Sequence, residues 1–92
     1  MRYEVKDNEV TIFLPNRIDS KNYEDIKKEI EDAISESGCT NICFDSTDTV
    51  FVSSAGLRVF MIMYKKYKIR FTNVSDNVRE IFDITGFINI FL

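Results

Sequence analysis

The chain has 92 residues, enough for one domain with a single core, and its 45% hydrophobic and 29% charged residues are typical of a folded globular protein. It contains no histidine, which excludes Ser-His-Asp and Cys-His catalytic centres and histidine-ligated metal sites. The net charge is −3, with six Lys and Arg against twelve Asp and Glu in residues 1–50, and this acidic balance argues against nucleic acid as the main partner.

The first fourteen residues alternate between apolar and polar side chains. Val10, Ile12 and Leu14 would share one face of a strand, and Asp7-Asn8 separates this stretch from an earlier one around Tyr3. Alternation on both sides of a two-residue turn predicts a β-hairpin, which Pro15 would end.

A helix is predicted next, over residues 23–36. Three residues able to cap its N-terminus precede it, and Gly38 is placed to end it in a left-handed conformation. Apolar residues recur at three- and four-residue spacing along one face: Tyr23, Ile26, Ile30, Ala33 and Ile34.

The middle of the chain is predicted to hold a strand over 41–45 and a second helix. Ile42 and Phe44 would share one face of this strand. The helix begins after the pair Ser53-Ser54 and runs to about Tyr64. Apolar residues surround it on more than one side, which indicates a largely buried helix.

The last third is predicted to hold a strand over 68–74, a third helix capped by Ser75 and ended by Gly86, and a final edge strand over 87–92. The predicted order is therefore ββαβαβαβ. Helical crossovers between strands predict an α/β domain with a mixed, mostly parallel sheet, an N-terminal antiparallel hairpin and about three helices.

Three further features indicate no special chemistry. Cys39 and Cys43 are too few for a disulfide framework, and their spacing suits neither zinc nor a redox pair, so reduced thiols and a cytoplasmic location are expected. The longest apolar run, 59–64, is far shorter than a membrane span, and the charged start of the chain predicts no signal peptide. A basic cluster is expected to be a solvated helix end: Lys65, Lys66, Lys68 and Arg70.

The stretch Ser53-Ser54-Ala55-Gly56 is the most unusual in the chain. One serine would cap the second helix, while the small residues would let a partner chain or a phosphate approach the backbone. A nucleophilic serine is disfavoured because no histidine can act as its base. Carboxylates that could bind Mg²⁺ or accept phosphate are expected to be solvated loop residues instead: Asp19, Asp45 and Asp48.

Three segments together carry a family resemblance. Residues 51–59 resemble a phosphorylation segment in which a serine opens a helix before a small residue, Gly and Leu. Residues 75–87 resemble a third helix with its closing Thr-Gly-Phe, and residues 16–19 resemble the turn before the first helix. Over residues 1–92 the chain resembles a STAS domain, and among these a stand-alone anti-sigma factor antagonist.

The resemblance implies a set of site residues. Ser54 matches the phosphorylated serine, Asp19 matches an acidic residue beside it, and Ser53 falls where several relatives have aspartate. Gly56 is expected near the docking face, so that Gly56→Leu would block binding with little unfolding. The partner-binding residues implied are Asp19, Asp45, Ser53, Ser54, Ala55, Gly56, Leu57 and Arg58.

The resemblance also implies a partner switch without catalysis by this chain. The unphosphorylated protein would bind a GHKL-type anti-sigma factor serine kinase and free a sigma factor, and a PPM-type phosphatase would reverse the phosphorylation. ATP and Mg²⁺ would belong to those enzymes, so this chain would need no cofactor or metal, bind no nucleic acid, insert into no membrane, and be a monomer or weak dimer. The alternative is a STAS scaffold, never phosphorylated, that serves as a regulatory subunit of a transporter or stress-signalling complex.

Overall fold

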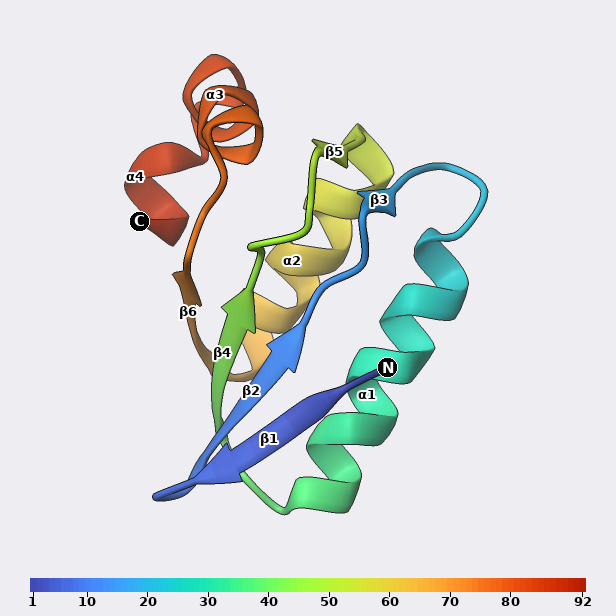
Figure 1. Cartoon of the computed structure of the whole chain (residues 1–92), viewed down its shortest axis with the longest axis vertical. Coiled ribbons are helices and arrows are strands. Elements are labelled where there is room, and N and C mark those ends of the chain that lie inside the picture. Colours follow the sequence, from blue (N-terminus) through green and yellow to red (C-terminus); the bar gives the residue numbers. More distant parts are fainter.

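Four strands form the main sheet of the computed structural model, which describes every residue from 1 to 92 (Figure 1). They are arranged in the order β1 (Tyr3–Lys6), β2 (Glu9–Phe13), β4 (Asn41–Asp45) and β6 (Lys68–Thr72). β1 and β2 are antiparallel, whereas β2–β4 and β4–β6 are parallel. The predicted mixed, mostly parallel sheet with an N-terminal hairpin is confirmed.

The hairpin turn has the conformation that its two residues favour. Asp7 and Asn8 both have positive φ, 52° and 67°. Two consecutive left-handed residues make a tight turn whose twist matches the flanking strands, and Asp and Asn tolerate that conformation better than other non-glycine residues.

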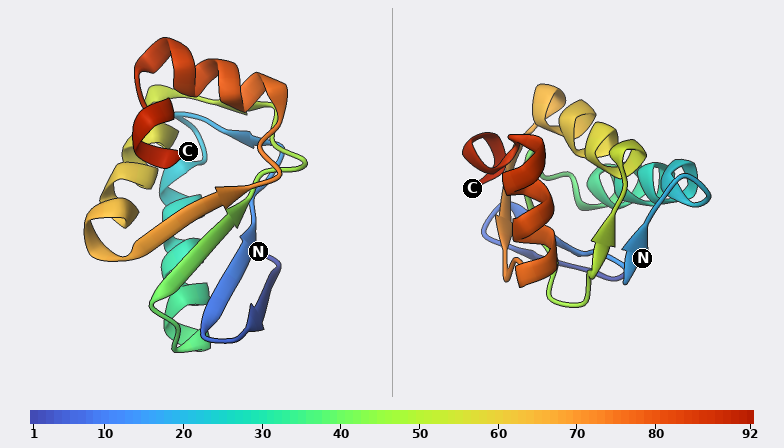
Figure 2. Two further views of the ribbon diagram at one scale, coloured as in Figure 1. Left: turned by 90° about the vertical axis from the view of Figure 1, so that its left-hand side faces the viewer. Right: turned by 90° about the horizontal axis from the view of Figure 1, so that it is seen from above.

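Two long helices cover one face of the main sheet. α1 (Tyr23–Ser37) and α2 (Ser54–Lys66) lie side by side there, and the opposite face is left open (Figures 1 and 2). α1 ends at Gly38, whose φ of 70° is the predicted left-handed stop. The apolar face predicted for α1 is buried at Ile26, Ile30 and the Ala33-Ile34 pair.

The core lies between the sheet and these helices. Alternate residues of the central strands point into it, and Val10, Ile12, Ile42 and Phe44 are fully buried. Phe60 of α2 lies at the centre of an aromatic cluster, with its ring centroid 5.6 Å from that of Phe44. The prediction of a largely buried α2 is only partly met: one face is buried, at Gly56, Leu57, Val59, Phe60 and Met63, whereas Ser54, Arg58 and the last turn are exposed.

The C-terminal segment differs from the prediction. α3 (Asp76–Thr85) forms as expected, with Ser75 as its cap, but residues 87–92 contain a short helix, α4 (Ile88–Phe91), and not an edge strand. One helical turn stacks Phe87 on Phe91 with centroids 5.4 Å apart and leaves Phe91 only 6% exposed in the aromatic cluster. A six-residue apolar run is compatible with both helical and strand periodicity, so the packing of its side chains decides which forms.

A second, two-stranded sheet was not predicted. β3 (Arg17–Ile18) and β5 (Phe51–Val52) pair in parallel beyond the ends of β2 and β4, with Ile18 opposite Val52 (Figure 1). Each strand has only two residues, too few for any periodic signal. This small sheet leads directly into the loop before α1 and into the start of α2.

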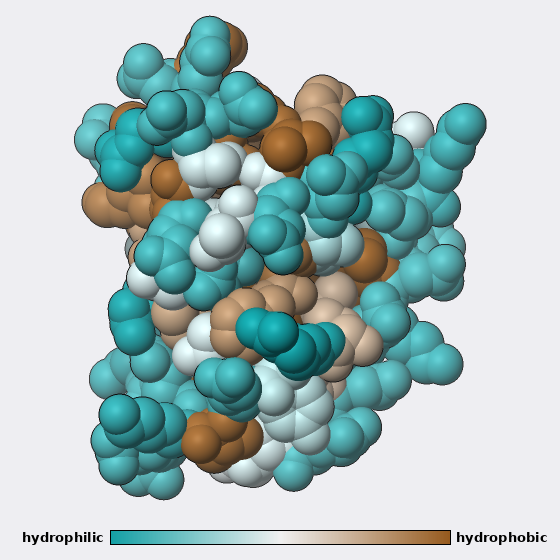
Figure 3. All heavy atoms as spheres, viewed as in Figure 1, coloured by the Kyte–Doolittle hydropathy of each residue, from teal (hydrophilic) through white to brown (hydrophobic).

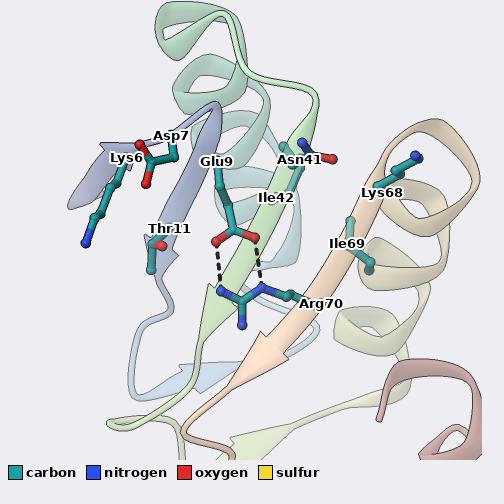
Figure 4. A pocket seen from close by; sticks show the side chains of 9 residues that line it. All are labelled: Lys6, Asp7, Glu9, Thr11, Asn41, Ile42, Lys68, Ile69 and Arg70. Atoms are coloured by element: carbon teal, nitrogen blue, oxygen red, sulfur yellow. Dashed lines mark hydrogen bonds and ion pairs between the residues drawn. The ribbon is translucent and has the colours of Figure 1, made fainter.

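The open face of the main sheet is mixed: hydrophilic residues surround a middle of intermediate and hydrophobic ones (Figure 3). On it, Glu9 of β2 and Arg70 of β6 form a two-pronged ion pair of 2.7 and 2.8 Å that crosses β4 (Figure 4). The predicted basic cluster is thus divided, because Lys66 on α2 pairs instead with Glu31 of α1 at 3.4 Å. None of the helices combines the length and the apolar character that a membrane-spanning segment needs.

Candidate functional site

The two serines at the start of α2 have different surroundings. The Ser53 hydroxyl accepts a hydrogen bond from the Gly56 N–H at 3.3 Å, and the Ser53 N–H donates to the Ile18 carbonyl at 2.8 Å. Ser53 is therefore the N-cap of α2. Ser54, the first residue of the helix, is exposed, and no protein group is hydrogen-bonded to its hydroxyl.

The β3–β5 pairing brings Asp19 beside this serine pair. Ile18 lies opposite Val52, so the residues that follow them in parallel strands, Asp19 and Ser53, are neighbours. The Asp19 carboxylate accepts hydrogen bonds from the backbone N–H groups of Lys21 at 2.9 Å and Asn22 at 3.2 Å. The expected proximity of Asp19 to the serines is therefore present in the fold.

Asp19 is held in its ionised form. The N–H of Lys21 has the largest effect and lowers the pKa of Asp19 below its ordinary value. Burial opposes it, and the N–H of Asn22 and the guanidinium of Arg17 each add a smaller lowering. The Arg17 Nε lies 3.6 Å from the Asp19 carboxylate. An ionised carboxylate paired with Arg17 thus lies on the β3 side of the serine pair at neutral pH.

An exposed aromatic residue beside the site was not singled out from the sequence. Phe51 of β5 is 37% exposed, and the Arg17 guanidinium lies over its ring at 4.8 Å from the centroid. Val50 is 45% exposed, while Val52 is buried. The sequence carries no signal for this difference, because residues 50–52 form a continuous apolar run. Apolar side chains exposed next to a free hydroxyl are typical of a protein-docking surface.

A groove of about 410 Å³ lies between α1 and α2, and Ala55, the residue after Ser54, lines it. Ala55, Val59 and Ile62 of α2 contribute apolar surface to it, and Arg58 lines it beside Tyr23 of α1. The hydrogen bond from the Tyr23 hydroxyl to Glu24 raises the pKa of Tyr23, and the positive charge of Arg58 opposes that rise. This hollow is the α1–α2 groove.

Two of the expected docking residues point into the protein. Gly56 and Leu57 are buried, and a Cβ placed on Gly56 would come within 2.8 Å of both Ile18 Cγ2 and Val52 Cγ1. The expectation that Gly56 lies on the docking face is therefore wrong. The exposed or partly exposed residues of the expected set are Asp19, Ser53, Ser54, Ala55 and Arg58.

The side chain of Asp45 is hydrogen-bonded to the loop that follows β4 and to Asn73. Its carboxylate accepts hydrogen bonds from the Thr47 N–H at 2.9 Å and hydroxyl at 2.6 Å, and from the Asn73 side-chain amide at 2.9 Å. Burial favours a higher pKa for Asp45, but these hydrogen bonds together outweigh burial and hold its pKa below the ordinary value. Asp45 is 8% exposed, so it contributes little surface to a partner.

The structure brings no group of three or more cysteine, aspartate or glutamate side chains together in a way that could hold a metal ion. The largest hollow, about 630 Å³, lies on the open face of the main sheet around Lys6, Asn41 and Lys68, and is crossed by the Glu9–Arg70 ion pair (Figure 4). Neither serine lines it.

Comparison with proteins of known sequence finds a related protein. The chain is 29% identical over 79 residues to BtrV of Bordetella bronchiseptica, which bears the name of an anti-sigma factor antagonist, and the match covers 80% of this chain and 67% of BtrV.

Solved structures show the same fold. An anti-sigma factor antagonist from Mycobacterium paratuberculosis superposes with a TM-score of 0.82 at 17% identity, covering 98% of this chain and 80% of that one. The antagonist SpoIIAA in its unphosphorylated form gives 0.77 at 22% identity, covering 99% and 84%. The phosphorylated form of SpoIIAA, a cell fate determinant of Bacillus, gives 0.69 at 22% identity, covering 99% and 87%.

The sequence profile of the STAS domain matches the chain from residue 1 to residue 92. This full-length match agrees with the mixed sheet, the paired helices on one face and the serine at the start of α2. The chain belongs to the STAS domain family.

Proposed function

We propose that this protein is an anti-sigma factor antagonist controlled by phosphorylation of Ser54. Unphosphorylated, it binds an anti-sigma factor that is also a GHKL-type serine kinase, which frees a sigma factor. Phosphorylation releases the complex, and a PPM-type phosphatase restores the active form. The protein works in the cytoplasm, where sigma factors act, and is itself a substrate and not an enzyme.

One observation supports this proposal above the others: Ser54 is exposed and its hydroxyl has no hydrogen-bond partner in the protein, while the adjacent Ser53 hydroxyl serves as the helix cap. A kinase can reach Ser54 without breaking a bond that the fold needs. The names of BtrV and SpoIIAA, and a phosphorylated form of SpoIIAA, point to the same function.

The chemistry of the switch is a phosphoryl transfer and its hydrolysis. The Ser54 Oγ attacks the γ-phosphorus of ATP, the bond to the β-phosphate oxygen breaks, ADP leaves, and the hydroxyl proton passes to a base of the kinase. In the reverse reaction, the phosphatase directs water at the phosphorus, which returns the serine hydroxyl and inorganic phosphate. This chain supplies only the hydroxyl.

The charge of the product explains why one hydroxyl can control binding. A phosphate adds about −1.5 to −2 charges at pH 7, next to an aspartate that is already ionised. A partner that packs against exposed Phe51 and a neutral serine would have to bury that charge, which is costly unless it is paired. A loss of ~3 kcal/mol lowers affinity more than a hundredfold.

The test is labelling by a purified GHKL-type anti-sigma kinase from the source organism, read by intact mass, together with calorimetric titration of each variant against that kinase. Ser54→Ala should bind and gain no phosphate, Ser54→Asp should bind at least tenfold more weakly, and Ser53→Ala should still be labelled. Ser75→Ala is the matched control, because it removes the serine cap of α3 and leaves α2 intact.

Two results would overturn the proposal. Labelling that survives in Ser54→Ala and disappears in Ser53→Ala would move the switch to the other serine. Binding without labelling of either serine, in protein from both growing and starved cells, would favour the scaffold function.

A further inference from the structure

Arg58 lies one helical turn after Ser54 on α2, and both residues are exposed. Side chains four residues apart on a helix are neighbours, with Cβ atoms about 5–6 Å apart. Helical side chains also lean toward the N-terminal end of the helix. The long Arg58 side chain is therefore expected to extend toward Ser54.

The guanidinium of Arg58 forms no ion pair, although two carboxylates line the same groove. Each of them has another partner: Glu24 accepts a hydrogen bond from the Tyr23 hydroxyl at 3.1 Å, and Glu31 pairs with Lys66 at 3.4 Å. By contrast Arg17, the other arginine near the serines, is paired with Asp19 and placed over Phe51. Arg58 is the arginine near Ser54 that remains available to an anion.

The charges on the two sides of Ser54 differ. The ionised Asp19 carboxylate lies on the β3 side, where Arg17 partly balances it. Arg58, Lys27 and Lys28 line the α1–α2 groove on the other side and outnumber its two carboxylates. An anion attached to Ser54 therefore meets a carboxylate already paired with an arginine on the first side and an excess of one positive charge on the second.

We propose that Arg58 holds the phosphate of phosphorylated Ser54 and turns it toward the α1–α2 groove. This inference rests on the proposed phosphorylation of Ser54. Arg58 is then a positioning residue for the modified side chain: its planar guanidinium pairs with two phosphate oxygens. The phosphate at the mouth of the groove would lie over Ala55, so the modification changes the groove as well as the Asp19 side.

The test uses protein with phosphoserine built in at position 54 during synthesis, so that no kinase is needed. Phosphorus-31 NMR follows the second ionisation of the phosphate, whose ordinary pKa is about 6. An adjacent guanidinium favours the dianion, so this pKa should be lower by ~0.2–0.7 units than in Arg58→Gln at low salt. The difference should shrink in 1 M salt, and Arg58→Lys should keep part of it.

Two control variants make the result specific. Lys65→Gln removes one cation near the far end of α2, about 16 Å along the helix axis from residue 54, and should leave the phosphate pKa unchanged. Arg17→Gln tests the other nearby arginine and should have a smaller effect than Arg58→Gln. An unchanged pKa in Arg58→Gln, or a larger rise in Arg17→Gln, would overturn the inference. Failure of the kinase to label Ser54 would instead count against the proposed function, because the NMR test does not involve a kinase.

Discussion

Gly56 in the first turn of α2 is packed against Ile18 of β3 so closely that a Cβ on Gly56 would come within 2.8 Å of the Ile18 Cγ2 methyl. The same Cβ would lie 2.8 Å from Val52 Cγ1. Both neighbours are β-branched residues with restricted rotamers, so they cannot easily move away. Glycine at this position lets the start of α2 lie directly against the small β3–β5 sheet, which places Ser53 and Ser54 at the surface.

Gly56→Ala is therefore expected to destabilise the fold. Overpacking costs about 1–3 kcal/mol, and the better helix propensity of alanine offsets it by about 1 kcal/mol. Denaturant unfolding should show a net loss of stability, and Gly56→Leu should be worse. In an Ile18→Ala background, which removes one of the clashing methyl groups, the cost of Gly56→Ala should be smaller. A wild-type melting temperature for Gly56→Leu would contradict the packing described.

The two adjacent serines should differ in their contribution to stability. Ser53→Ala removes the cap of α2 and should cost about 0.5–2 kcal/mol. Ser54→Ala removes an exposed hydroxyl without a partner and should change stability by less than about 0.5 kcal/mol. Thermal unfolding of the two variants side by side measures this difference, and equal losses would show that the cap is not formed by Ser53 alone.

The Asp45 carboxylate should make the fold sensitive to acid. Its pKa is lowered in the folded protein, so the stability it contributes is present above the unfolded pKa of about 3.9 and is lost as the pH falls through the lower folded pKa. Asp45→Ala should cost about 1–3 kcal/mol at pH 7, because the Thr47 N–H loses its buried acceptor. Asp45→Asn should flatten the loss of stability below pH 4. Urea unfolding from pH 7 to pH 3 tests both, and an unaltered acid slope in Asp45→Asn would assign the sensitivity to another carboxylate.

The Arg70 side chain should shield a buried thiol. Cys43, the cross-strand neighbour of Arg70, is 1% exposed although it lies on the open face of the main sheet, and burial raises the pKa of its thiol. Arg70→Ala should speed the reaction of Cys43 with a thiol reagent, while stability falls by less than about 1 kcal/mol because the pair is exposed.

That experiment is best done with Cys39→Ser, so that a single thiol is counted. Glu9→Gln is the control, since it removes the ion pair and keeps a side chain of similar size over the strand. An unchanged rate in Arg70→Ala would mean that the strands themselves, and not the arginine, exclude the reagent.

The local pattern of the chain was enough to predict most of the elements. The hairpin with its Asp7-Asn8 turn, the stop at Gly38, the cap at Ser75 and the crossover order follow from short-range rules of backbone conformation and periodicity. The family resemblance added Asp19 and Ser54, which the fold does place on neighbouring elements. A role for either residue in binding stays a prediction.

The tertiary structure decided what depends on residues far apart in the chain. The β3–β5 pair has no periodic signal, α4 forms because Phe91 can enter the aromatic cluster, and Gly56 is buried because Ile18 lies opposite. The bond between Asp45 and Asn73 joins residues 28 positions apart and leaves Asp45 only 8% exposed, which no local pattern predicts. Sequence by itself determines which backbone conformations and faces are favoured, whereas only packing determines which side of a helix turn is covered and which hydroxyl or carboxylate is left free.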